Sequence, residues 1–157
     1  MVRALSDDPY VPLTGTLPAH ASDTQALDWM HRQQSRHREG TGFSFTIVEA
    51  ATDQPIGHCG LWLRELDSGR ATAGFSLIAA ARGRGLATDA LHAVTAFGWT
   101  VPGVRRIELS IEPSNAASLR TAERAGYRRV SETTSRHVIG GEERAVLVFG
   151  APAPQEG

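Results

Sequence analysis

Two glycines and two arginines stand in residues 79–91, AAARGRGLATDAL, where an apolar, strand-like segment ends and a helical pattern begins. Gly83 and Gly85 permit backbone conformations and a close approach that a side chain would block. The helix that follows offers unpaired N–H groups and the positive end of its dipole. Arg82 and Arg84 add charges that suit phosphate oxygens. The turn is predicted to bind a diphosphate, and the alternative is an ordinary glycine-rich loop with solvated arginines.

The residues that the turn lacks narrow the choice of ligand. The chain contains no lysine, which excludes a Walker-type phosphate lysine and a Schiff-base mechanism. A dinucleotide fingerprint would need a third glycine where Thr88 stands. Nucleotide binding of either kind is therefore disfavoured.

The segments around the turn predict a mixture of helices and strands. Ser22 to Gln25 have the spacing of a capping box, which starts a helix that Gly40 can end. The predicted strands are residues 43–49, 56–66, 70–78 and 105–111, with a closing hairpin of 127–139 and 142–149 joined at Gly140 and Gly141. Further helices are predicted from residue 86 to 101 and from 115 to Gly126, while 1–20 have no regular pattern and 151–157 form a disordered tail.

This order of elements indicates one α+β domain over residues 1–150 with a mixed sheet. The strand-helix-strand unit of residues 70–111 requires one parallel pair inside an otherwise antiparallel sheet. Ligands of such sheets bind at the carboxyl ends of the strands where the strand order switches. The glycine-rich turn lies at that point.

Composition limits the classes of partner. The 157 residues carry 16 basic and 17 acidic side chains, a net charge of −1, so no overall field attracts nucleic acid or an anionic membrane. The single Cys59 can form neither an internal disulfide nor a metal-binding pair, which favours a cytoplasmic setting and no metal. Signal-peptide and membrane-spanning patterns are both absent from the sequence. The three tryptophans are spread over separate elements and are assigned to core or cleft walls.

The turn and a second motif resemble one enzyme family. The sequence Arg82-Gly83-Arg84-Gly85-Leu86-Ala87 resembles the Q/R-x-x-G-x-G/A signature with which the GNAT superfamily of acetyltransferases binds the pyrophosphate of acetyl-coenzyme A. Downstream, IEPSNAASLRTAERAGY is similar to the next strand and helix of the RimJ/RimL-like branch. The resemblance covers residues 21–149 in element order. It implies the GNAT fold and acetyl-CoA as co-substrate.

The resemblance also assigns roles to individual residues. Backbone N–H groups of the turn would hold the pyrophosphate, and the end of the preceding strand would pair with the pantetheine arm like an added strand. Asn115 would contact the cofactor or serve as a helix N-cap. Ser118 would protonate the departing thiolate or be an ordinary surface serine. The implied cofactor-binding residues are Phe75, Ser76, Leu77, Arg82, Gly83, Arg84, Gly85, Leu86, Ala87, Thr88 and Asn115.

The general base of the family is missing. Ser110 and Ala122 stand where RimI-like relatives have glutamate and tyrosine, and Thr72 stands where many RimJ/RimL-like sequences have glutamate. The remaining base candidates are His58, Glu65, Glu132 and His137, of which His58 and Glu65 join Ser118 as the predicted catalytic residues. A proton can also leave through water. The missing carboxylate favours a low-pKa acceptor such as an α-amine.

The expected reaction is acetyl transfer to a primary amine, either a protein N-terminus or a small molecule such as an aminoglycoside or polyamine. The acceptor would meet the variable loops of residues 9–40 and 131–142. A non-catalytic acyl-CoA-binding regulatory module is the alternative. A nucleic-acid adaptor, based on Arg82, Arg84, Arg105 and Arg106, is a third hypothesis.

The front of the chain departs from the family. Relatives begin with a strand and a helix, and here only the closing turn, residues 5–9, matches. The first strand is expected to be missing, either natively or because the native start lies elsewhere. Residues 43–49 would then form an exposed sheet edge at which a homodimer could pair.

Overall fold

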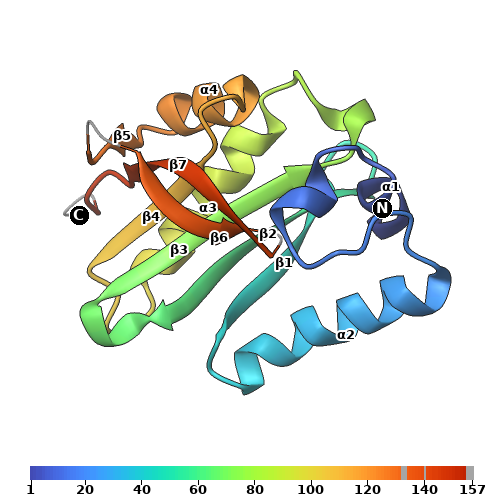
Figure 1. Ribbon diagram of the computed structural model, residues 1–157, viewed down its shortest axis with the longest axis horizontal. Helices are drawn as coiled ribbons and strands as arrows, with labels where there is room; N and C mark the ends of the chain where they lie inside the picture. The colour runs from blue at the N-terminus through green and yellow to red at the C-terminus, as the bar shows by residue number, and fades with distance from the viewer. Residues whose placement is uncertain (132–133, 140, 155–157) are drawn as a thin grey trace.

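The computed structural model describes residues 1–131, 134–139 and 141–154 (Figure 1). Its helices are α1 (Val2–Ser6), α2 (Asp23–Arg38), α3 (Leu86–Trp99) and α4 (Ala116–Arg124), with 3-10 turns η1 (Val11–Thr14), η2 (Leu66–Ser68) and η3 (Ala79–Ala81). Its strands are β1 (Gly42–Glu49), β2 (Gln54–Glu65), β3 (Arg70–Leu77), β4 (Arg106–Ile111), β5 (Arg128–Arg129), β6 (Ser135–Ile139) and β7 (Glu142–Gly150). None of the helices in these ranges is long and apolar enough to cross a bilayer.

The strands form one mixed sheet in the order β1-β2-β3-β4-β7-β5, with β6 paired to β7. The predicted parallel pair is β3 and β4, and its register is short: it runs from Arg70 opposite Arg106 to Thr72 opposite Glu108. Beyond that point β4 pairs with β7, whereas β3 continues to Leu77 with β2 as its partner. The two parallel strands therefore separate at their carboxyl ends, where a mixed sheet binds its ligands.

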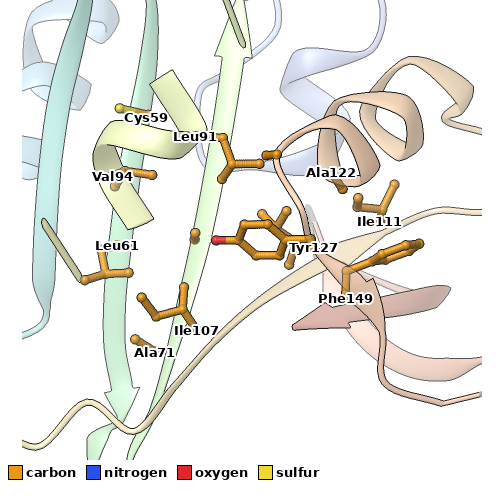
Figure 2. Packing of buried hydrophobic residues seen from close by; sticks show 13 residues of the cluster. Cys59, Leu61, Ala71, Leu91, Val94, Ile107, Ile111, Ala122, Tyr127 and Phe149 are labelled. Carbon is orange, nitrogen blue, oxygen red and sulfur yellow. The ribbon is translucent and has the colours of Figure 1, made fainter. Parts of the chain in front are cut away.

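The main core lies on the face of the sheet that α3 and α4 cover. Alternate residues of the central strands point to this face, as period-two alternation requires, and Leu61 and Ala71 are fully buried there. Figure 2 shows Leu91 and Val94 of α3 packed over these strands, with Tyr127 between the helices and β4. The remaining alternate positions face α2 and the first residues of the chain, where the functional cleft lies.

Most predicted elements are confirmed. Ser22 makes the predicted capping box with Gln25 at the start of α2, and Gly85 precedes α3 as expected. The prediction of one strand over residues 127–139 was wrong. Residues 128–129 and 135–139 form separate strands, because they pair with opposite ends of β7. Gly140 of the predicted hairpin turn lies outside the described residues.

Residues 1–20 are more ordered than their proline-rich pattern predicted. Val2 and Leu5 of α1 are buried with Leu17, Ala26 and Trp29 in a second apolar cluster that docks the front of the chain against α2. Among the described residues no strand pairs with the outer edge of β1. The predicted exposed edge is confirmed, and a second copy pairing there stays a prediction.

Candidate active site

A cleft of about 980 Å³ follows the line along which β3 and β4 separate. The end of β3 and the glycine-rich turn form one wall, and the end of β4 with the start of α4 forms the opposite wall. Residues of α1, η1 and α2 close one side, and β6 reaches the cleft from the other. All predicted site residues except Arg84 line this cleft, so segments far apart in the sequence contribute to a single cavity.

The glycine-rich turn has the geometry of an anion site. Gly83 and Gly85 have φ angles of +75° and +81°, which residues with a side chain rarely adopt. A Cβ atom added to either glycine would meet no atom within 4 Å, so the space above the turn is open. Gly85 is the N-cap of α3, and no side chain caps this helix end. The first-turn N–H groups are therefore available to an external acceptor, which fits the pyrophosphate of acetyl-CoA.

The two arginines of the turn are engaged in ion pairs, and their contact with phosphate oxygens stays a prediction. Arg84 pairs with Glu49 at the end of β1 and does not line the cleft. Arg82 lines the cleft, but its Nη2 atom lies 2.5 Å from Asp8 Oδ2 and donates to the Leu77 carbonyl at 2.8 Å. Tertiary pairing of this kind leaves no local signal in the sequence. The backbone N–H groups of the turn, unlike these two side chains, have no such partner among the described residues at the start of α3.

Asp8 links the front of the chain to the turn. Its carboxylate accepts hydrogen bonds from the backbone N–H groups of Tyr10 and Val11 and pairs with Arg82. Burial alone would raise the pKa of Asp8, but these donors together hold it below the ordinary value. Asp8 is therefore ionised at neutral pH and stabilises the position of Arg82 beside the cleft.

Replacing Asp8 with asparagine is expected to lower the free energy of unfolding by about 1–3 kcal/mol at pH 7, the usual range for hydrogen bonds to a charged group. Because the folded pKa is depressed, the contribution is complete above the unfolded value of about 3.9 and is lost as the pH falls through the folded value. Urea unfolding at pH 7 and below pH 4 checks this. Asp7→Asn is the matched control, because Asp7 is exposed and pairs only with exposed His20. Equal losses in both variants would contradict the prediction.

The last residues of β3 present an unpaired backbone edge to the cleft. Phe75, Ser76 and Leu77 pair with β2 on one side, and β4 has already separated from them on the other. The backbone groups on this edge lie between the glycine-rich turn and the start of α4, and among them the Leu77 carbonyl already accepts from Arg82. An extended chain such as pantetheine can pair with such an edge as an added strand.

Asn115 and Ser118 lie at the start of α4 on the opposite wall. The Asn115 side chain accepts a hydrogen bond of 3.2 Å from the Ser118 backbone N–H, so Asn115 is the helix N-cap. Its contact with the cofactor stays a prediction. The Ser118 hydroxyl makes no hydrogen bond to any described residue and lines the cleft. It is available as a donor.

Comparison with known proteins agrees with this geometry. Residues 2–128 match the sequence profile described as "Acetyltransferase (GNAT) domain". The chain belongs to the GNAT acetyltransferase family. It is 28% identical over 122 residues to the uncharacterized N-acetyltransferase p20 of Bacillus licheniformis. The aligned region covers 78% of this chain and 68% of p20.

Two solved structures share the GNAT fold with this chain. RimL, a ribosomal α-N-protein acetyltransferase in complex with coenzyme A, superposes with a TM-score of 0.77 at 16% identity, covering 94% of this chain and 82% of RimL. AAC(6')-Ib in complex with ribostamycin and coenzyme A gives a TM-score of 0.71 at 19% identity, covering 94% and 85% of the two chains. This GNAT domain is thus an acetyl-CoA-dependent N-acetyltransferase.

Two of the predicted base candidates of this GNAT domain, His58 and Glu65, are constrained by their surroundings. His58 lies edge-on to Trp29, its Nε2 is buried without a partner, and burial followed by the charge of Arg36 lowers its pKa to about 4. Such an imidazole is neutral at pH 7 but is a weak base. Glu65 forms an ion pair in which its Oε1 atom lies 2.9 Å from Arg70 Nη2.

The two other candidates differ in what the structure describes. The His137 ring Nδ1 lies 3.1 Å from the Ser110 hydroxyl, and Glu132 lies outside the described residues. Within the described part of the chain, each candidate carboxylate or imidazole is thus paired, or is weakened as a base by burial.

Sequence reasoning missed a charged cluster at the end of β4. The Tyr10 hydroxyl donates to Glu112 Oε2, and Arg144 Nη1 donates to Glu112 Oε1 at 3.0 Å. The Tyr10 hydrogen bond, followed by Arg144, holds the pKa of Glu112 below its ordinary value, while burial and Glu112 raise the pKa of Tyr10 to about 12. The alternation of β4 could have placed Glu112 on the cleft face. No pattern in residues 1–20 indicated that Tyr10 would reach it.

Proposed function

We propose that this GNAT domain acetylates a primary amine, on a protein N-terminus or on a small molecule, by direct attack of the neutral amine on the thioester. The observation that carries the proposal is the continuity of the cleft, which joins the glycine-rich turn, the free edge of β3 and the Ser118 hydroxyl. Acetyl-CoA supplies the acetyl group in activated, thioester form. The domain fits the RimJ/RimL-like branch through its Asn115 and Ser118 pattern.

Each wall of the cleft would then have a definite task. The N–H groups at the start of α3 hold the anionic end of the co-substrate, and the edge of β3 aligns the extended arm. The Ser118 hydroxyl, which lines the same cleft, donates a hydrogen bond to the leaving sulfur in this proposal. Asn115 positions Ser118 by fixing the first turn of α4.

The low basicity of His58 and the ion pair of Glu65 bear on the choice of acceptor. An α-amine with a pKa of about 7.7–8.0 is partly neutral at pH 7, whereas a lysine side chain near 10.4 is almost wholly charged. A site that removes protons poorly suits the α-amine, with water carrying the proton away. RimL is named for α-N-protein acetylation, which agrees with this choice. The free, buried Cys59 is consistent with a reducing compartment, so we place the reaction in the cytoplasm.

Steady-state assays with acetyl-CoA and matched peptides test the proposal. One peptide offers a free α-amine and arginine in place of lysine, and its partner has a blocked N-terminus and one lysine. Acetylation of the first with the larger kcat/KM supports the proposal. Preference for the lysine peptide removes the α-amine assignment, and binding of acetyl-CoA without transfer to any amine favours the non-catalytic alternative.

A further inference from the structure

Trp62 forms the floor of the cleft on the side facing α2. A Cβ atom added to Gly60 or Gly74 would approach the Trp62 ring to 3.0 Å or 2.8 Å. Gly60 and Gly74 are direct partners in the β2–β3 pair, so the indole lies flat on the sheet where both strands lack side chains. Gly74 lies two residues after Thr72, which is the last β3 residue paired with β4. The indole therefore lies beside the point where the parallel strands separate.

Arg36 of α2 lies above this indole. Its guanidinium carbon is 5.9 Å from the centre of the Trp62 ring, within the range of a cation–π contact. Arg36 Nε donates to Gln33 Oε1 at 2.7 Å, and the buried Gln33 also accepts from the Ser44 hydroxyl at 3.1 Å. The guanidinium is thus fixed by a buried amide, and its remaining N–H groups have no carboxylate within ion-pair distance among the described residues.

A second guanidinium adds positive charge to the part of the cleft that Arg36 lines. Arg64 follows Trp62 by two positions on β2 and also lines the cleft. Burial, followed by the charge of Arg64, lowers the pKa of Arg36, and Glu39 at the end of α2 offsets this only in part. Arg64 forms no ion pair with any described residue. Two like charges held close together create a site that an anion would relieve.

The acidic groups of this part of the cleft are already neutralised. Glu65 pairs with Arg70 at 2.9 Å, and Glu112 pairs with Arg144 at 3.0 Å. Arg36, over the Trp62 ring, and Arg64, two positions after Trp62 on β2, therefore line the cleft without an ion pair to any described carboxylate. A polyamine or an aminoglycoside would bring further positive charge to them and would be disfavoured.

We propose that the acceptor of this domain is a primary amine that also carries a carboxylate, which Arg36 and Arg64 bind while the Trp62 indole supports the aliphatic part. This inference rests on the proposed acetyl transfer. It identifies Arg36 and Arg64 as specificity-determining residues, because they bind the acceptor away from the reacting nitrogen. A free amino acid and a peptide with an acidic residue next to its N-terminus offer the same chemistry.

The test compares acceptors that differ only in charge, at fixed acetyl-CoA. Leucine is paired with leucinamide, and a serine-glutamate tripeptide amide with its serine-glutamine counterpart, while spermidine and ribostamycin represent polycations. At least one carboxylate member is expected to exceed its neutral partner by about tenfold or more in kcat/KM, as a charge-assisted contact allows. The first pair tests whether a free amino acid is the acceptor, and the second pair tests whether the N-terminus of a peptide is the acceptor.

Two variants test whether Arg36 and Arg64 cause the preference for a carboxylate acceptor. Arg36→Gln and Arg64→Gln are expected to raise KM for the favoured carboxylate acceptor about tenfold, with little change for its neutral partner or for acetyl-CoA. Arg38→Gln is the control, because Arg38 is exposed on the same helix and does not line the cleft. An unchanged KM for acetyl-CoA shows that the variants are folded.

The outcomes separate the two proposals. Equal or better acetylation of neutral or polycationic amines would overturn the charge inference and leave the proposed acetyl transfer in place. Loss of activity toward charged and neutral acceptors alike in Arg36→Gln would also overturn it, since a general structural role would explain that result. Absence of transfer to every acceptor would overturn both proposals.

Discussion

Replacing Gly85 with glutamate is expected to raise the Kd for acetyl-CoA by about 100-fold or more, which corresponds to about 2.7 kcal/mol. Gly85 has a φ angle of +81° and caps α3 with open space above it. A glutamate there would place a carboxylate among the N–H groups that receive the pyrophosphate, so like charges would meet. The domain should stay folded, because a carboxylate at a helix N-terminus is favourable to the helix itself. Calorimetric titration with acetyl-CoA measures the change.

Gly103→Glu is the matched control for this variant. Gly103 has a similar φ angle of +88°, so glutamate there introduces the same backbone strain and the same charge beyond the opposite end of α3. This variant should bind acetyl-CoA like the unmodified chain, with a stability loss of about 1–3 kcal/mol shared by both variants. Equal binding by the Gly85 and Gly103 variants would show that the turn does not hold the co-substrate.

Local sequence signals predicted the cofactor half of the cleft well. The capping box at Ser22, the two glycines before α3 and the asparagine before α4 each act within one turn of chain, so residue type and spacing were enough. The change from period-two to helical spacing after β3 likewise predicted the parallel pair and its crevice. Local rules therefore located the glycine-rich turn and the N-cap of α4, and the fold brings them to opposite walls of one cleft.

The acceptor half depended on contacts that no local pattern encodes. Alternation along β2 puts His58, Trp62 and Arg64 on one face, but only the docking of α2 brings Arg36 over the indole. Arg82 and Arg84 illustrate the same limit. Their types suited phosphate, yet the fold pairs them with Asp8 and Glu49 from distant segments.

The first residues of the chain link the two walls of the cleft. Tyr10 donates to Glu112 on the β4 wall, while Asp8, two residues earlier, binds Arg82 on the β3 wall. The segment containing η1 thereby spans the cleft from one wall to the other. A shift of this segment would alter both the turn and the end of β4, so the two sites are expected to respond together.

Replacing Ser118 with alanine is expected to lower kcat by about 100-fold, at the lower end of the usual contribution of a positioned proton donor. Its hydroxyl has no partner among the described residues, so alanine removes a free donor and breaks no bond. The helix should be unaffected, because Asn115 accepts from the Ser118 backbone N–H, which alanine retains. The Kd for acetyl-CoA should therefore change little, which calorimetry can verify beside the kinetic assay.

Ser114→Ala provides the comparison for that loss. Ser114 precedes the N-cap of the same helix, is exposed, and does not line the cleft. Its replacement should leave kcat within about twofold, the range of a surface change without contacts. A kcat loss in Ser118→Ala with unchanged acetyl-CoA binding would assign the hydroxyl to the transition state, since uniform binding would alter KM instead. An unchanged kcat would show that the leaving sulfur takes its proton from water, and Ser118 would then be an ordinary residue of the cleft wall.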